Sequence, residues 1–114
     1  MIARGYIPPD LLEDVKNRLN ITWSDQATDK RIRGLIAEGT AYLDSKAGTA
    51  MEYQRDGLAR TLLMEYARYA RDEALDVFEN NYRHMILAMQ AGVEVRQIVE
   101  ETAETVGGGD AAVQ

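Results

Sequence analysis

Apolar residues recur at three- and four-residue steps along nearly the whole chain, and this period most limits the folds open to it. No stretch shows the strict apolar–polar alternation of a half-buried strand. Glycine and proline interrupt the helical period at only a few places. The sequence therefore predicts an all-α protein, a small helical bundle of four main helices with a C-terminal extension.

Capping signals indicate where the first two helices begin and end. We expect one over about 9–19, where Asp10 and Glu13 are spaced like a capping box just after two prolines. We expect the second over about 25–46, because Asp25 can cap its N-terminus and a glycine follows its last turn.

The later helices are expected over about 54–72 and 74–90. The polar run 71–73 lies between them, and we expect a kink or a break there. The pair Ala91-Gly92 is expected to end the fourth helix, because glycine weakens a helix interior.

The chain of 114 residues fits one core, so we divide it into a helical domain over 1–92 and an extension over 93–114, helical at first and then flexible. Val95, Ile98 and Val99 keep the helical spacing within this extension. If the bundle closes before them, their apolar stripe is surplus to the core and marks a partner contact. A fifth helix that folds back onto the same domain is the alternative.

The composition offers no sign of an active site. Cysteine is absent, and His84 is the single histidine, so a metal site has no obvious ligands. Neighbouring carboxylates such as Glu100 and Glu101 point in different directions on a helix and cannot act as an acid/base pair. We therefore predict no enzymatic activity, no catalytic residue, no cofactor and no metal. No apolar run approaches the ~20 residues of a membrane span, so a cytoplasmic protein is expected.

Candidate interface residues come from the third helix as well as from the extension. Arg60, Arg68 and Arg71 line up as a basic stripe, which is either a solvated face or a contact for the acidic C-terminal segment of a neighbouring subunit. Tyr69 is either part of the core or an interface anchor.

Several short motifs, in this order and spacing, resemble the head–tail connector (head-completion adaptor) family of long-tailed bacteriophages. The first is the stretch Leu11–Asp25, with the letters LL-x-x-V-K-x-x-L followed by I-T-W-x-D. A long helix then ends in Ala41-Tyr42-Leu43, and the segment from Phe78 reads F-x-x-N-Y-x-x-x-I. The resemblance covers about residues 10–90.

This resemblance implies a structural protein. Members of the family form a ring, commonly of twelve subunits, beneath the portal protein of a DNA-filled capsid. The ring extends the channel through which DNA passes without specific binding, and a stopper or tail-completion protein docks on it. The resemblance thus places the chain in the virion neck, and in the host cytoplasm during assembly. The formal net charge of -6 agrees with a channel that does not grip DNA.

A small helical DNA-binding or DNA-packaging regulator, such as a small terminase subunit, is the alternative function. Lys30, Arg31 and Arg33 give the second helix some positive charge, as a recognition helix requires. The acids Asp25 and Asp29 adjoin them, however, and no further basic arm is present.

Overall fold

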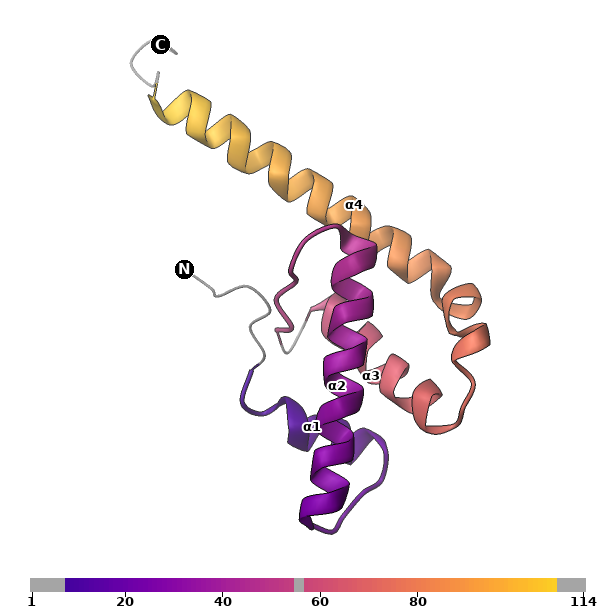
Figure 1. Ribbon diagram of the computed structural model, residues 1–114. Coiled ribbons are helices and arrows are strands. Elements are labelled where there is room, and N and C mark those ends of the chain that lie inside the picture. Colours follow the sequence, from indigo (N-terminus) through magenta and orange to yellow (C-terminus); the bar gives the residue numbers. More distant parts are fainter. Residues whose placement is uncertain (1–7, 55–56, 109–114) are drawn as a thin grey trace.

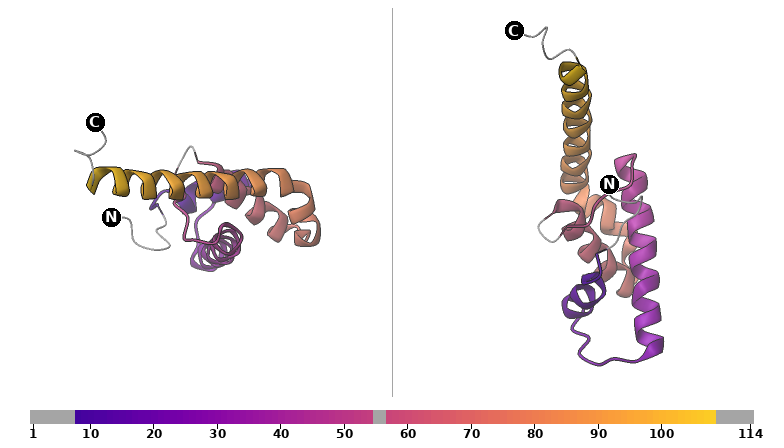
Figure 2. Two further views of the ribbon diagram at one scale, coloured as in Figure 1. Left: turned by 90° about the horizontal axis from the view of Figure 1, so that it is seen from above. Right: turned by 90° about the vertical axis from the view of Figure 1, so that its left-hand side faces the viewer.

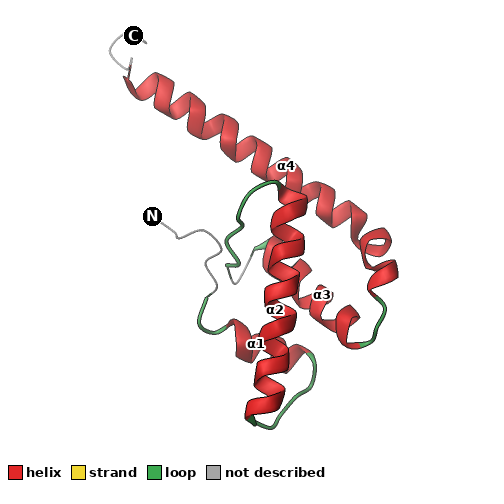
Figure 3. Ribbon diagram, viewed as in Figure 1, coloured by secondary structure: helices red, strands yellow, loops and turns green. Residues whose placement is uncertain are grey.

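The computed structural model describes residues 8–54 and 57–108, and these parts contain four helices and no strand (Figures 1 and 3). The predicted all-α bundle is confirmed. The helices are α1 (Leu11–Arg18), α2 (Gln26–Ala47), α3 (Leu58–Arg71) and α4 (Leu75–Gly108).

The two ends of α2 follow the predicted signals. The side chain of Asp25 accepts a hydrogen bond from the backbone N–H of Thr28 at 2.9 Å, which satisfies one of the free donors of the first turn. At the other end Gly48 adopts a left-handed conformation with φ 79°, which favours glycine. Both expectations for this helix are confirmed.

The predicted capping box of α1 is wrong. Asp10 is the N-cap residue, but its side chain makes no capping hydrogen bond. Its carboxylate instead accepts hydrogen bonds from Arg60 of α3, at 3.3 and 3.4 Å. An ion pair to a buried arginine 50 residues away thus takes the place of the local cap.

Aromatic side chains form the centre of the bundle, where α2, α3 and α4 meet. Phe78 is 1% exposed, and its ring centroid lies 5.1 to 5.9 Å from those of four tyrosines. These distances are typical of aromatic pairs that pack edge-on or offset. The tyrosines are Tyr42 of α2, Tyr66 and Tyr69 of α3, and Tyr82 of α4. This cluster fixes where α4 begins its path across the other helices.

The polar run after α3 breaks the helix, as expected. Asp72 ends α3, Glu73 has a φ of 55°, and the backbone N–H of Ala74 donates to the carbonyl of Tyr69 at 2.8 Å. This tight turn folds α4 back onto α3. Leu75 then begins α4.

The expected end of the fourth helix at Ala91-Gly92 is wrong, because α4 continues without a break to Gly108. Contacts on both sides of the glycine hold the helix together. Before it, the side-chain amide of Gln90 donates to the carbonyl of Lys46 at 2.8 Å. After it, Val93 is 5% exposed and so packs on the body. These contacts offset the ~1 kcal/mol that a helical glycine costs.

Beyond Val93, α4 leaves the body and projects as a free helix (Figure 2). We call residues 94–108 the α4 tip. The whole helix has 34 residues and is about 51 Å long. The described chain measures 59 × 29 × 19 Å, and its radius of gyration of 17.2 Å exceeds the roughly 13 Å of a compact 100-residue domain. The alternative of a fifth helix that folds back onto the domain is therefore wrong.

Candidate interaction surface

Arg60 does not belong to an exposed basic stripe, contrary to expectation. It is 3% exposed and donates to the carboxylates of Asp10 and Asp14 and to the carbonyl of Tyr53. Three acceptors satisfy the buried guanidinium, which ties α1 and the loop before α3 to α3. Arg60 is therefore a structural residue with no charge to offer a partner.

The other two arginines of the expected stripe are also occupied. Arg68 donates to Glu65 at 2.6 and 3.0 Å, and Arg71 donates to the carbonyl of Leu19 at 2.8 Å and to Asp72 at 3.1 Å. Both side chains are partly exposed. Both guanidinium groups are already paired within the chain, which weakens the prediction that this face of α3 attracts an acidic segment.

Glu65 is the hub of this arrangement. It is 6% exposed and accepts hydrogen bonds from Arg18 of α1, Arg68 and Tyr82 of α4. Burial acts to raise the pKa of the Glu65 carboxyl, but these hydrogen bonds outweigh it and hold the pKa below its ordinary value. The carboxyl is thus a charged link between three helices.

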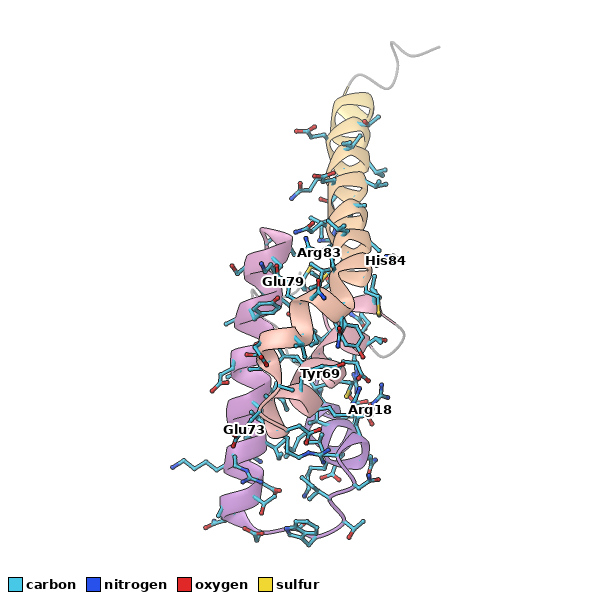
Figure 4. The ribbon with its side chains drawn as sticks, turned by 90° about the vertical axis from the view of Figure 1, so that its right-hand side faces the viewer. Arg18, Tyr69, Glu73, Glu79, Arg83 and His84 are labelled. Carbon is cyan, nitrogen blue, oxygen red and sulfur yellow. The ribbon has the colours of Figure 1, made fainter. Side chains whose placement is uncertain are left out.

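Tyr69 lies mainly with the core. Its ring packs edge-on against Phe78 and Tyr82, at centroid distances of 5.5 and 5.6 Å. Its hydroxyl accepts a hydrogen bond from the side chain of Asn81 at 3.0 Å. Figure 4 shows it on α3 beneath the start of α4. Its contacts favour the interpretation of Tyr69 as a core residue with a partly exposed ring.

The apolar residues of the extension, by contrast, have no partner in the described chain. Val95, Ile98 and Val99 are 59%, 60% and 58% exposed. Side chains on this part of α4 extend into open space, with no other helix beside them (Figure 4). Large exposed apolar side chains grouped in this way are typical of contact sites.

The apolar line of α4 changes sides where the helix leaves the body. Up to Val93 the apolar side chains face α2 and α3, and on that side the next residues are Arg96, Gln97 and Glu100. Val95 and Ile98 instead lie on the side turned away from the body. Leu87, which is 55% exposed, begins the same outer line further back. The exposed apolar line of the tip therefore faces away from the body.

A second surface, which carries exposed cations, lies on the N-terminal half of α2. Lys30, Arg31 and Arg33 are exposed, and the structure gives them no ion pair within the described chain. The neighbouring acids do not neutralise them, because Asp25 caps the helix and Asp29 pairs with the buried Lys16 at 2.9 Å. In the sequence these three cations indicate only DNA binding.

The turn before α2 exposes one large aromatic side chain. Trp23 is 54% exposed, and its indole N–H donates to the hydroxyl of Thr28 at 3.3 Å. That hydroxyl in turn donates to Asp25 at 2.7 Å. Tryptophan held in this way is a frequent anchor of protein interfaces.

The surface thus offers apolar and charged contacts for binding. Among the residues that the structure describes, no group of three or more histidines, cysteines or acids could hold a metal ion. Within the same residues, no helix is both long and apolar enough to cross a membrane.

Comparisons of the chain with models of protein families, with curated proteins and with solved structures find no match.

Proposed function

We propose that the chain is a subunit of the head–tail connector of a tailed bacteriophage or prophage. Copies of it would form a ring under the portal protein, extend the DNA channel and provide the docking surface for a stopper or tail-completion protein. The order of the motifs between residues 10 and 90 is the sequence argument for this proposal.

The free apolar face of the α4 tip is the observation that carries the proposal. The motif-bearing segment packs as one body, and the same continuous helix then extends outward with Val95, Ile98 and Val99 uncovered. A body with a projecting, partner-seeking helix suits an assembly subunit, because each copy can reach beyond itself to bind another protein. The charge of -6 supports the same function, because acidic walls repel DNA phosphates.

Assembly on the portal tests this function. The purified chain is mixed with the portal protein encoded in the same genome, and the product is examined by negative-stain electron microscopy. We expect a ring added beneath the portal by the full chain, and a weaker or absent ring from a chain that ends after Val93, the last residue that packs on the body. A full chain that adds no density to the portal would contradict the proposal.

The exposed cations of α2 keep a DNA-binding regulator as the second candidate. Lys30, Arg31 and Arg33 have no ion-pair partners in the described chain and could contact phosphates. Three such contacts would make log K fall with log[salt] at a slope of about -3. Fluorescence anisotropy with duplex DNA at two salt concentrations measures this slope, and tight binding with such a slope would favour the regulator over the connector.

A further inference from the structure

We propose that the α4 tip of one copy docks on the outer face of α2 in the next copy. The outer α2 face is defined by its exposed residues Lys30, Arg31, Arg33, Gly34, Ala37, Glu38 and Ala41. The inference rests on the proposed function in one respect, namely that copies of this chain assemble with one another. It assigns the two surfaces through which they do so.

The tip cannot be covered by its own body. Its apolar residues Val95 and Ile98 lie on the side of α4 turned away from α2 and α3. Val93 is the last residue of α4 that the body buries. Arg96 still lines a hollow beside the loop before α3, and the rest of the tip points away from the body (Figures 1 and 2). A second molecule must therefore supply whatever buries this face.

Charge selects the surface on that second molecule. The described part of the tip carries Glu94, Glu100 and Glu101 against the single cation Arg96, and none of these charges has an ion pair in the described chain. Two tips packed on each other would bring this excess of negative charge together, which is unfavourable. The outer α2 face carries three equally unpaired cations against the single acid Glu38, so its net charge is positive and the two surfaces complement each other.

Shape favours the same pairing. On the C-terminal side of its cations the outer α2 face presents the short side chains of Ala37 and Ala41, and a Cβ placed on Gly34 would meet nothing within 4 Å. A helix can approach such a surface closely, to the 8–10 Å that separates packed helix axes. The branched side chains of Val95 and Ile98 would then fill the space over the small residues, with Lys30 and Arg31 near Glu94 and Glu101 of the tip.

The positions of the two surfaces make this a head-to-tail contact. Gln90 binds the C-terminal end of α2, so α4 crosses α2 there and the tip lies beyond that end. The cations lie on the N-terminal half of α2, at the opposite end of the molecule (Figure 1). A contact between two different patches leaves one free tip and one free α2 face at the two ends of any open row of copies. The row has no free ends once the rotation between successive copies closes it into a ring.

Disulfide trapping tests the contact. The natural chain has no cysteine, so every disulfide that forms involves the introduced residues. Ile98→Cys is mixed with Ala37→Cys in one sample and with Asn17→Cys, an exposed control position on α1, in another. A disulfide forms only where the two Cα atoms come within about 7 Å. We expect roughly tenfold more heterodimer from the 37–98 pair than from the 17–98 pair, equivalent to ~1.4 kcal/mol. The yield should fall at high salt, which screens the charges.

Charge reversal provides the matched control. The pair Lys30→Glu and Arg31→Glu on the Ala37→Cys chain should reduce the crosslink to the level of the control. The pair Glu94→Lys and Glu101→Lys, which flank Ile98 on the helix, should restore it on the Ile98→Cys chain when the two reversed chains are combined. Equal yields from the 37–98 and 17–98 pairs, or a dominant 98–98 homodimer, would overturn the proposal.

The outcome also separates this contact from the function on which it rests. A specific 37–98 crosslink in a chain that adds no ring to portals would leave the contact standing and contradict the connector. Portal-bound rings whose subunits give no 37–98 crosslink would support the connector and overturn the contact.

Discussion

Two glycines of α2 make the packing of this helix directly testable. Gly39 is buried against α3: a Cβ there would lie 2.5 Å from Leu63 Cδ1 and 3.0 Å from Tyr66 Cδ1. Gly34 is five residues, or about 1.4 turns, earlier on the exposed side, where a Cβ meets nothing within 4 Å. The same change to alanine at the two positions therefore isolates the cost of the close approach of α2 and α3.

The two substitutions should have opposite signs. Gly34→Ala should raise the free energy of unfolding by about 0.5–1 kcal/mol, because alanine restricts the unfolded chain and favours helix. Gly39→Ala has the same gain but must displace Leu63, which is fully buried, and the rigid ring of Tyr66. Overpacking of this kind costs about 1–3 kcal/mol, so the variant should be less stable than Gly34→Ala by that amount.

Urea denaturation followed by circular dichroism measures both variants, at a protein concentration low enough to avoid self-association. We expect the urea midpoints of the two variants to move in opposite directions while the dependence of the free energy on urea stays unchanged. In thermal melts their Tm values should differ by about 4 °C per kcal/mol. If Gly39→Ala were as stable as Gly34→Ala, α2 and α3 would not approach as closely as described, and the position of the aromatic cluster would be wrong.

Three further changes test the core, the ionic hub and the free face. Phe78→Ala should lower the free energy of unfolding by about 3–5 kcal/mol, because it removes the ring around which four tyrosines pack. Thermal denaturation measures this loss, and a loss below about 1 kcal/mol would contradict the aromatic cluster. Glu65→Gln should cost about 1.5–3 kcal/mol at pH 7. Because the folded pKa of Glu65 lies below its ordinary value of about 4.3, this stabilisation is present above that value and is lost as the pH falls through the lowered pKa. Urea titrations from pH 7 to 3 should therefore show the two proteins converging in acid, and a constant difference would refute the charged hub. Ile98→Ser should change stability by less than about 0.5 kcal/mol, and a larger loss in calorimetry would mean that the tip is covered within the monomer.

Local signals in the sequence were sufficient for most of the fold. The helical period gave the all-α class, Asp25 and Gly48 marked the ends of α2, and the polar run before Leu75 marked the break between α3 and α4. Each of these features depends on residues within a few positions of one another. That is why they could be predicted.

Features that depend on distant partners were not predicted. Arg60 reads as an exposed stripe residue, yet it is buried against Asp10 and Asp14, 50 and 46 residues away. Gly92 reads as a helix end, yet contacts of Gln90 and Val93 with the body carry the helix through it. Local propensity cannot register either effect, because both come from tertiary packing.

The candidate surface was predicted in part. The apolar spacing of Val95, Ile98 and Val99 was visible, and their exposure agrees with the expectation that the core does not need them. Their role in an interface stays a prediction. The cations of α2 also have a signal in the sequence that suits a protein contact, because the helical wheel places Lys30 opposite the apolar stripe of that helix.

Because α4 is unbroken, it moves as one rigid rod, and the aromatic rings packed around Phe78 set the angle at which this rod leaves the body. About 45 Å of helix extends from Phe78 to Gly108, so a tilt of about 10° at Phe78 moves the far end by about 8 Å. The angle between successive copies, and with it the curvature of any closed assembly, would then depend on side chains that no partner ever touches. Conservative repacking around Phe78 could alter the number of subunits in a ring while leaving every contacting residue intact.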